Sequence, residues 1–158
     1  MLHNRLKSFF SHVFSSIFIG RIILIKCSNS EGLIVGIGTD IIEVDRIEKK
    51  LTKEKGLKFT LFTPEEITYC ESKRFSYQHF AARFAAKEAF FKALGTGWRF
   101  GMRYQEIEIV NDELGNPEIK ISGRVQEEIS KRGIDKVHVS LSHLKSIANA
   151  FVVLEGSD

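Results

Sequence analysis

The clearest pattern of apolar and polar positions lies in the middle of the chain. Phe80, Phe84 and Phe91 are spaced by four and seven residues, which places their side chains along one side of an α-helix. Most positions between them hold Ala, Lys or Glu, which favour helix. A glycine directly after Leu94 is a typical helix end. The pattern therefore predicts a helix over 80–94 with one stripe packed on a core.

Two charged residues of this helix, Glu88 and Lys92, lie along the same stripe and are one turn apart. A carboxylate and an ammonium beside an apolar stripe are costly unless they are paired, hydrated or bound to a ligand. One interpretation is an exposed ion pair between the two side chains, which stabilises a helix by about 0.2–0.5 kcal/mol. The other interpretation is a ligand site. The helix considered by itself favours the ion pair.

A short apolar run over 33–44 is broken by two glycines. It predicts a buried strand whose backbone is approached closely by another element. Asp40 stands among these apolar residues and has two interpretations. It could cap a helix predicted over 41–51, or it could be a metal ligand at a strand end. Arg46, within that helix, is most simply an exposed charge.

A second helix start is marked by Thr63, Pro64 and Glu66. Threonine is a preferred N-cap, proline is favoured at the first helical position, and a glutamate three residues after the cap completes a capping box. We expect this helix to run to about Ser72. A brief extended piece is predicted just before it, over 59–61.

The last third of the chain alternates apolar and polar residues, which predicts strands. We expect these strands over 104–110, 118–121, 136–143 and 146–154, with a helix over 125–132. Turn residues separate the first two strands, so they should pair as a hairpin. The chain therefore belongs to the α+β class.

Composition limits the class of protein but does not indicate a function. The chain has 158 residues, enough for one domain with a core, and 43% hydrophobic and 27% charged residues argue against disorder. The net charge of +3, from 23 basic and 20 acidic residues, is too weak to suggest a nucleic acid partner. Two cysteines make neither a metal motif nor a disulfide framework. We therefore expect a reducing compartment and a cytoplasmic protein.

Residues 1–32 differ from the rest of the chain. A basic start and an apolar run over 9–25 are compatible with a signal peptide or a membrane anchor. However, Arg21 breaks the run well short of the roughly 20 residues that span a bilayer, and it would cost about 2.5–3.5 kcal/mol there. We expect a dispensable extension, with a targeting peptide or a membrane-contacting surface segment as less favoured alternatives. The folded domain would then cover 33–158.

Asp40 and Glu88, without a group of Cys and His, point to a hard cation such as Mg²⁺ rather than zinc. Mg²⁺ takes one or two protein carboxylates and completes its shell with water and phosphate oxygens. Glycines after the central helix would let backbone approach such a ligand. The candidate phosphate-binding residues are Arg83, Lys92, His143 and the turn Gly95, Thr96, Gly97.

Three segments, taken together and in this order, resemble one family. They are Gly36–Ile42, Arg83–Gly97 and His138–His143. The chain is similar over about 33–155 to the holo-[acyl-carrier-protein] synthase family, the small bacterial type of 4′-phosphopantetheinyl transferase. The middle segment is the specific one, and the other two support it.

The resemblance implies a fold and an activity. The fold is an antiparallel sheet packed on a long central helix, in a homotrimer with active sites between subunits. The activity is Mg²⁺-dependent transfer of the 4′-phosphopantetheine moiety of coenzyme A to a serine of apo-acyl carrier protein. The products are holo-acyl carrier protein and adenosine 3′,5′-bisphosphate, in fatty acid biosynthesis.

The resemblance also implies roles for residues. Asp40 and Glu88 would bind Mg²⁺ and act in catalysis with Lys92, while Arg46 would contact the carrier protein. The residues that would bind coenzyme A are Arg83, Lys92, Gly95, Thr96, Gly97 and His143. The proton of the attacking serine could pass to Glu88 or to a water on the metal, and both remain open.

Two alternative functions remain. One is a transferase of the same fold that serves another carrier domain, such as one in a polyketide synthase. The other is a non-catalytic protein that binds coenzyme A. The presence of Asp40, Glu88 and Lys92 together argues against the second, because a non-catalytic relative has no need of all three.

Overall fold

The computed structural model describes residues 32–54, 56–97 and 101–157. The extension expected over 1–32 therefore lies outside the described residues except for Gly32. The strands are β1 (Leu33–Glu43), β2 (Ile107–Asn111), β3 (Pro117–Ile121), β4 (Ile134–His143) and β5 (Ile147–Gly156). The helices are α2 (Val44–Lys53), α3 (Leu57–Leu61), α4 (Pro64–Glu71), α5 (Ser76–Leu94), the 3₁₀ turn η1 (Tyr104–Glu106) and α6 (Gly123–Lys131).

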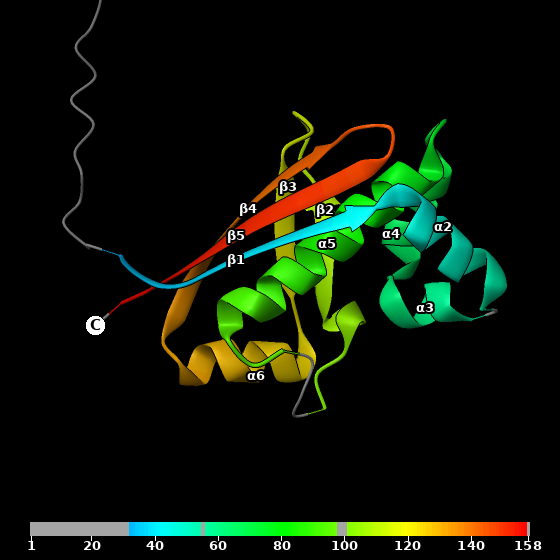
Figure 1. Cartoon of the computed structure of the whole chain (residues 1–158). Helices are drawn as coiled ribbons and strands as arrows, with labels where there is room; N and C mark the ends of the chain where they lie inside the picture. Colours follow the sequence, from blue (N-terminus) through cyan, green and yellow to red (C-terminus); the bar gives the residue numbers. More distant parts are fainter. Residues whose placement is uncertain (1–31, 55, 98–100, 158) are drawn as a thin grey trace, which may run out of the picture. The chain divides into compact units, whose positions relative to one another are not determined.

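The described residues form two antiparallel sheets around the long helix α5 (Figure 1). One sheet has three strands in the order β1-β5-β4, and the other is the hairpin β2-β3. Helix α5 packs on β1 and β5. The expected α+β class and the antiparallel sheet on a central helix are both confirmed. No described helix combines the length and the apolar content needed to cross a membrane.

The contact between α5 and β1 depends on two glycines. A Cβ at Gly36 would lie 2.1 Å from the carbonyl oxygen of Ala93, and a Cβ at Gly38 would lie 2.0 Å from that of Ala89. No side chain fits at such distances, so only glycine permits the helix to lie directly on the strand. The close backbone approach predicted from the glycines is confirmed, and α5 is the element that makes it.

Helix α5 is buried on almost every side. Between Phe80 and Leu94, every residue is buried except Phe84, Glu88 and Lys92. These three are spaced by four residues and form one less covered stripe. The helix and its end at Gly95 are confirmed. The expected stripe does face the core, since Phe80, Phe91 and Leu94 are buried and the half-buried Phe84 packs against them, but burial extends far beyond that stripe.

The structure corrects three other local predictions. The segment expected to be extended over 59–61 is part of helix α3. That helix begins directly after Gly56, whose φ is 96°. Asp40 caps no helix, because β1 continues to Glu43 and that residue precedes α2. The expected strand over 104–110 also begins with the turn η1 rather than in extended form.

The capping box at the start of α4 is confirmed. The Thr63 hydroxyl accepts a hydrogen bond from the Glu66 amide at 3.2 Å, and the Glu66 carboxylate accepts one from the Thr63 amide at 2.9 Å. Glu66 nevertheless has a further partner that the sequence does not reveal. Its Oε2 lies 2.6 Å from the ammonium of Lys87, and both side chains are fully buried.

Lys87 is surrounded by acceptors. Besides Glu66, its ammonium donates to the carbonyl oxygens of Leu61 at 2.7 Å and of Tyr104 at 3.0 Å. Burial lowers the pKa of this ammonium, and the Glu66 carboxylate opposes that shift. A buried charge is tolerated only when it is paired and hydrogen-bonded, as Lys87 is. The residue therefore ties α5 to α3, α4 and η1 from inside the protein.

We predict that Gly38→Ala lowers the free energy of unfolding by about 3 kcal/mol, the upper end of the usual cost of an overpacked side chain. The added methyl group meets backbone atoms of α5, which cannot change rotamer to make room. Urea denaturation followed by circular dichroism measures this change. The control is Gly32→Ala, whose methyl group meets only the Glu155 side chain, with its nearest atom at 2.9 Å. Equal stabilities of the two variants would contradict the close packing described for α5 and β1.

Candidate active site

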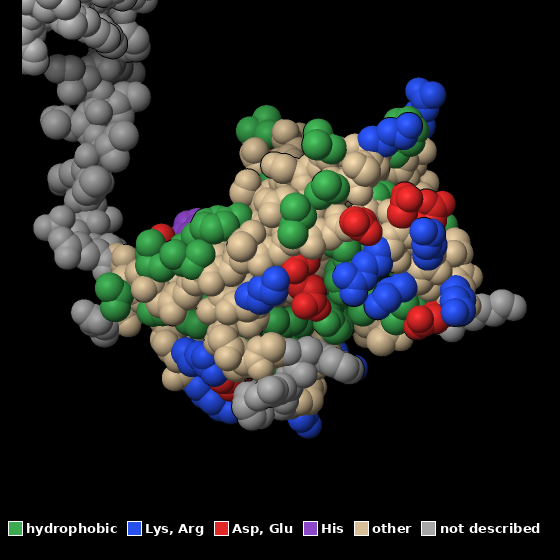
Figure 2. Space-filling model, viewed as in Figure 1, with side chains coloured by type: hydrophobic (Ala, Val, Ile, Leu, Met, Phe, Trp, Pro, Cys, Tyr) green, Lys and Arg blue, Asp and Glu red, His purple; other side chains and the backbone are tan. Residues whose placement is uncertain are grey.

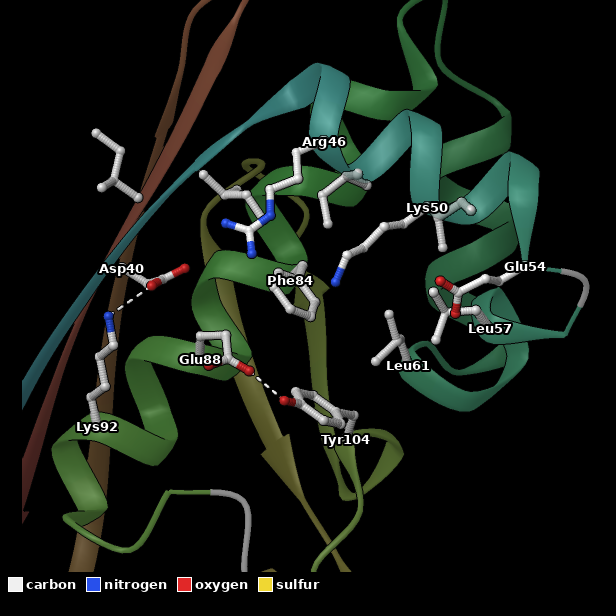
Figure 3. Close-up of a pocket in the computed structure, with 14 residues that line it drawn as sticks. Asp40, Arg46, Lys50, Glu54, Leu57, Leu61, Phe84, Glu88, Lys92 and Tyr104 are labelled. Carbon is white, nitrogen blue, oxygen red and sulfur yellow. Dashed lines mark hydrogen bonds and ion pairs between the residues drawn. The ribbon is translucent and has the colours of Figure 1, made fainter.

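A cavity of about 450 Å³ opens between β1, α2, α3, α5 and η1 (Figure 3). One end is charged and is lined by Asp40, Glu88 and Lys92. The opposite end lies at α2 and α3 and mixes apolar with charged side chains, namely Leu57, Leu61, Lys50 and Glu54. Figure 2 shows acidic and basic side chains gathered over α2 and α5 on the same face. The cavity thus joins predicted residues from two of the three segments, Gly36–Ile42 and Arg83–Gly97.

Strand geometry explains the position of Asp40. Side chains two residues apart on a strand point to the same face, so Asp40 shares the face of Gly36 and Gly38 that α5 covers. Its carboxylate accepts a hydrogen bond from the Lys92 ammonium at 2.7 Å. Lys92 also donates to the Thr39 carbonyl oxygen at 3.0 Å. Close packing of α5 on β1 therefore brings together two residues that are 52 positions apart in the chain.

Of the two interpretations of Glu88 and Lys92, the ion pair between them is wrong. Lys92 pairs with Asp40, and the Glu88 carboxylate accepts a hydrogen bond from the hydroxyl of Tyr104 (Figure 3). Burial and the Glu88 carboxylate both raise the pKa of the Tyr104 phenol. The phenol therefore remains a donor at neutral pH. Tyr104 was expected only as the start of a strand and not as a residue of the site.

The two carboxylates fit a hard divalent cation. Asp40 and Glu88 line the same cavity from different elements, so their oxygens can face one ligand. Mg²⁺ needs no more than one or two protein carboxylates when water and phosphate oxygens complete its shell. Among the described residues, no three or more His, Cys, Asp or Glu side chains gather to form a larger metal site. The donor set thus suits Mg²⁺ better than an ion that needs an all-protein shell.

Basic side chains of α2 border the cavity. Arg46 and Lys50 are one helical turn apart, and both are exposed and line it. Figure 3 shows the Arg46 guanidinium directed toward the space beside Asp40 and Glu88. Lys50 was missed at the sequence level, although its spacing of four residues from Arg46 places it on the same helix face. An acidic surface or a phosphate group would be attracted to this side of the cavity.

Arg83 does not line the cavity. Its guanidinium is buried, donates to the side-chain oxygen of Asn111 at 2.7 Å and stacks over Tyr69 at 3.9 Å. Its Nε is also buried and has no hydrogen-bond partner among the described residues. In this chain, then, Arg83 holds α5 against neighbouring elements, and its predicted contact with coenzyme A stays a prediction.

His143 and the glycine turn also lie apart from the cavity. His143 ends β4 as predicted, and its ring lies 5.2 Å from that of His79. Gly95 and Gly97 follow α5 with φ values of 72° and 60°, a conformation that favours glycine. Thr96 lies between them. The structure brings Asp40, Arg46, Glu88 and Lys92 together, but not these residues.

Comparison with known protein families identifies the superfamily to which the chain is similar. The family model described as the 4′-phosphopantetheinyl transferase superfamily matches residues 36–149. A relative from Geobacter sp. (strain M21), named holo-[acyl-carrier-protein] synthase, is 49% identical over 124 residues, which cover 78% of this chain and 99% of that protein. A relative of the same name from Geotalea daltonii is 47% identical with the same coverage.

Solved structures agree with these relatives. The holo-[acyl-carrier-protein] synthase from Neisseria meningitidis matches with a TM-score of 0.72 and 36% identity, over 78% of this chain and 99% of that one. The Bacillus anthracis synthase, solved in complex with CoA (3′,5′-ADP), matches with a TM-score of 0.66 and 40% identity, over 78% and 98%. The charged cavity therefore lies in a fold that these synthases share.

Proposed function

Because the chain belongs to the 4′-phosphopantetheinyl transferase superfamily, we propose that it transfers the 4′-phosphopantetheine moiety of coenzyme A to a serine of apo-acyl carrier protein. The observation that carries the proposal is the joining of Asp40, Glu88 and Lys92 at one end of the cavity. These residues come from two of the segments that carry the family resemblance. The near-complete coverage of the Geobacter synthase adds support.

The reaction is a phosphoryl transfer. The serine oxygen forms a bond to the phosphorus on the pantetheine side of the pyrophosphate, and the bond from that phosphorus to the bridging oxygen breaks. Adenosine 3′,5′-bisphosphate leaves, and the serine proton passes to a base. Such reactions depend mainly on positioning and on stabilising charge at the oxygens. The holo-acyl carrier protein then serves fatty acid biosynthesis.

Asp40 and Glu88 are the residues that would hold Mg²⁺. When bound, the cation would neutralise charge on the pyrophosphate and on the leaving oxygen. Lys92 lies 2.7 Å from Asp40 with about half of its side chain exposed, so its ammonium can reach a phosphate oxygen while remaining near the carboxylate. The role of Asp40 is therefore double, as a cation ligand and as the partner that orients Lys92.

Arg46 and Lys50 are proposed to bind the carrier protein. Both are exposed beside the charged end of the cavity. The family resemblance implies that the partner is the acidic acyl carrier protein. Complementary charge speeds encounter and fixes orientation more than it adds affinity. A carrier docked on α2 would present its serine to the cavity.

Assembly as a homotrimer is part of the proposal. The face of the β1-β5-β4 sheet opposite α5 exposes Ile37, Ile41 and Phe151 by 57%, 66% and 43%. Adjacent exposed apolar side chains on a sheet are typical of an interface between protein chains. In a trimer with sites between subunits, the predicted coenzyme A contacts of Arg83, His143 and the turn Gly95, Thr96, Gly97 would complete a neighbour's cavity.

We also propose the limits and location of the domain. The transferase domain would cover 33–158, with 1–32 as an extension outside it, because the family match begins at residue 36. Cys70 is a buried free cysteine, and burial raises the pKa of its thiol to about 12. Free thiols persist in reducing compartments, which supports a cytoplasmic location.

We predict that the purified full chain, with Mg²⁺ and coenzyme A, increases the mass of apo-acyl carrier protein by one phosphopantetheine group. Mass spectrometry of the intact carrier protein measures this. A carrier domain from a polyketide synthase, tested in parallel, separates the two transferase alternatives. Absence of any mass increase, with the carrier shown to be modified by another transferase, would exclude the enzymatic proposal and leave a coenzyme-A-binding protein.

We predict that Glu88→Gln lowers the transfer rate more than about 100-fold, beyond the usual cost of losing a residue that only supports a metal ligand. Gln has nearly the shape of Glu and can still accept from Tyr104, so the fold should be unchanged by circular dichroism. The control is Glu118→Gln on the exposed side of β3, which should retain the wild-type rate. Near-normal turnover by the Glu88 variant would refute its role as a metal ligand.

A further inference from the structure

Tyr104 is held along its whole length by one face of α5. Its ring is stacked on Phe84, with centroids 5.9 Å apart, and forms a T-shaped pair with Phe91, with centroids 5.4 Å apart. Its carbonyl oxygen accepts from Lys87 at 3.0 Å, and its hydroxyl donates to Glu88. These four helix residues have relative positions 0, 3, 4 and 7, which place them on one face. Ring, backbone and hydroxyl are therefore all fixed against the same helix.

The anchor at Lys87 is rigid. Its ammonium is fully buried and also contacts Glu66 at 2.6 Å and the carbonyl oxygen of Leu61 at 2.7 Å. Glu66 in turn accepts from the Ile109 amide at 3.0 Å. The backbone of Tyr104 is thus connected to α3, α4 and β2 through the fully buried ammonium of Lys87 and the Glu66 carboxylate. With its backbone and ring fixed in this way, the Tyr104 side chain holds its hydroxyl in one position.

The hydroxyl acts on only one of the two oxygens of Glu88. It donates to Oε1, while Oε2 accepts no hydrogen bond from the described residues. A carboxylate held at one oxygen keeps its side chain in one orientation and still offers the other oxygen to a ligand. Groups that hydrogen-bond to metal ligands in this way fix the ligand orientation, and their loss typically costs 10–100-fold in metal affinity or activity.

We propose that Tyr104 is a positioning residue that holds Glu88 ready to receive the divalent cation, with the buried pair of Lys87 and Glu66 as its anchor. The inference rests on the proposed function, because it presumes that Glu88 is a cation ligand. Packing explains the ring but not the hydroxyl, since phenylalanine would make the same contacts with Phe84 and Phe91. The contribution of the hydroxyl is the orientation of the carboxylate before the cation arrives.

The test is Tyr104→Phe, which removes the hydroxyl and keeps the ring. We expect binding of Mn²⁺ in the presence of coenzyme A, followed by electron paramagnetic resonance, to weaken about tenfold. In the transfer assay, the Mg²⁺ concentration for half-maximal rate should rise by a similar factor, with a smaller fall in kcat. The control is Tyr77→Phe, whose ring packs on Phe80 away from the cavity and which should change neither quantity.

The outcomes separate this inference from the proposed function. If the wild-type protein transfers phosphopantetheine and binds Mn²⁺ but Tyr104→Phe binds it equally well or more tightly, the positioning role is refuted while the function stands. A loss confined to kcat, or a lowered melting temperature with unchanged Mn²⁺ affinity, refutes it as well. If the wild-type protein binds no Mn²⁺, the cation site itself fails, and the inference fails with it.

Discussion

The site depends on the direct contact of α5 with β1 across Gly36 and Gly38. Their missing side chains let the carbonyl oxygens of Ala89 and Ala93 approach the strand so closely that a Cβ would lie about 2 Å away. Because strand side chains alternate, the next residue on that face is Asp40. The same contact places Lys92, between the two alanines, within hydrogen-bond distance of Asp40. The spacing of two glycines and an aspartate on one strand thus determines where the charged end of the cavity forms.

Helix α5 also separates two charged residues that are adjacent in sequence. Successive helical residues differ by about 100° in direction, so Lys87 points into the core and Glu88 into the cavity. The ammonium of Lys87 is stabilised by Glu66 and by two carbonyl oxygens, whereas Glu88 accepts from Tyr104 and keeps access to a ligand. One turn of helix therefore provides both the internal support of the site and one of its reactive groups.

Local signals in the sequence predicted much of the fold. The capping box at Thr63, the helix end at Gly95 and the alternation along β4 depend on neighbouring residues, and the structure confirms all three. The side-chain contacts that form the site, between Lys92 and Asp40 and between Tyr104 and Glu88, join positions far apart in the chain. Local patterns could not predict them. The pattern around Glu88 and Lys92, considered by itself, favoured an ion pair, because the direction of each side chain depends on which elements cover the helix. Tyr104 carried no local signal, since its importance comes from packing on α5.

The family resemblance supplied the function. The roles of Arg83, His143 and the glycine turn, which lie apart from the cavity of one chain, stay predictions.

We propose that Asp40 and Glu88 of one cavity hold the same divalent cation. Anomalous diffraction from crystals grown with Mn²⁺ and coenzyme A tests it most directly, because it locates the metal without reference to activity. We expect one strong anomalous peak within coordination distance of both carboxylates and of the pyrophosphate oxygens. A peak that contacts only one of the two carboxylates, or a bound coenzyme A whose pyrophosphate lies away from this cavity, would contradict the account.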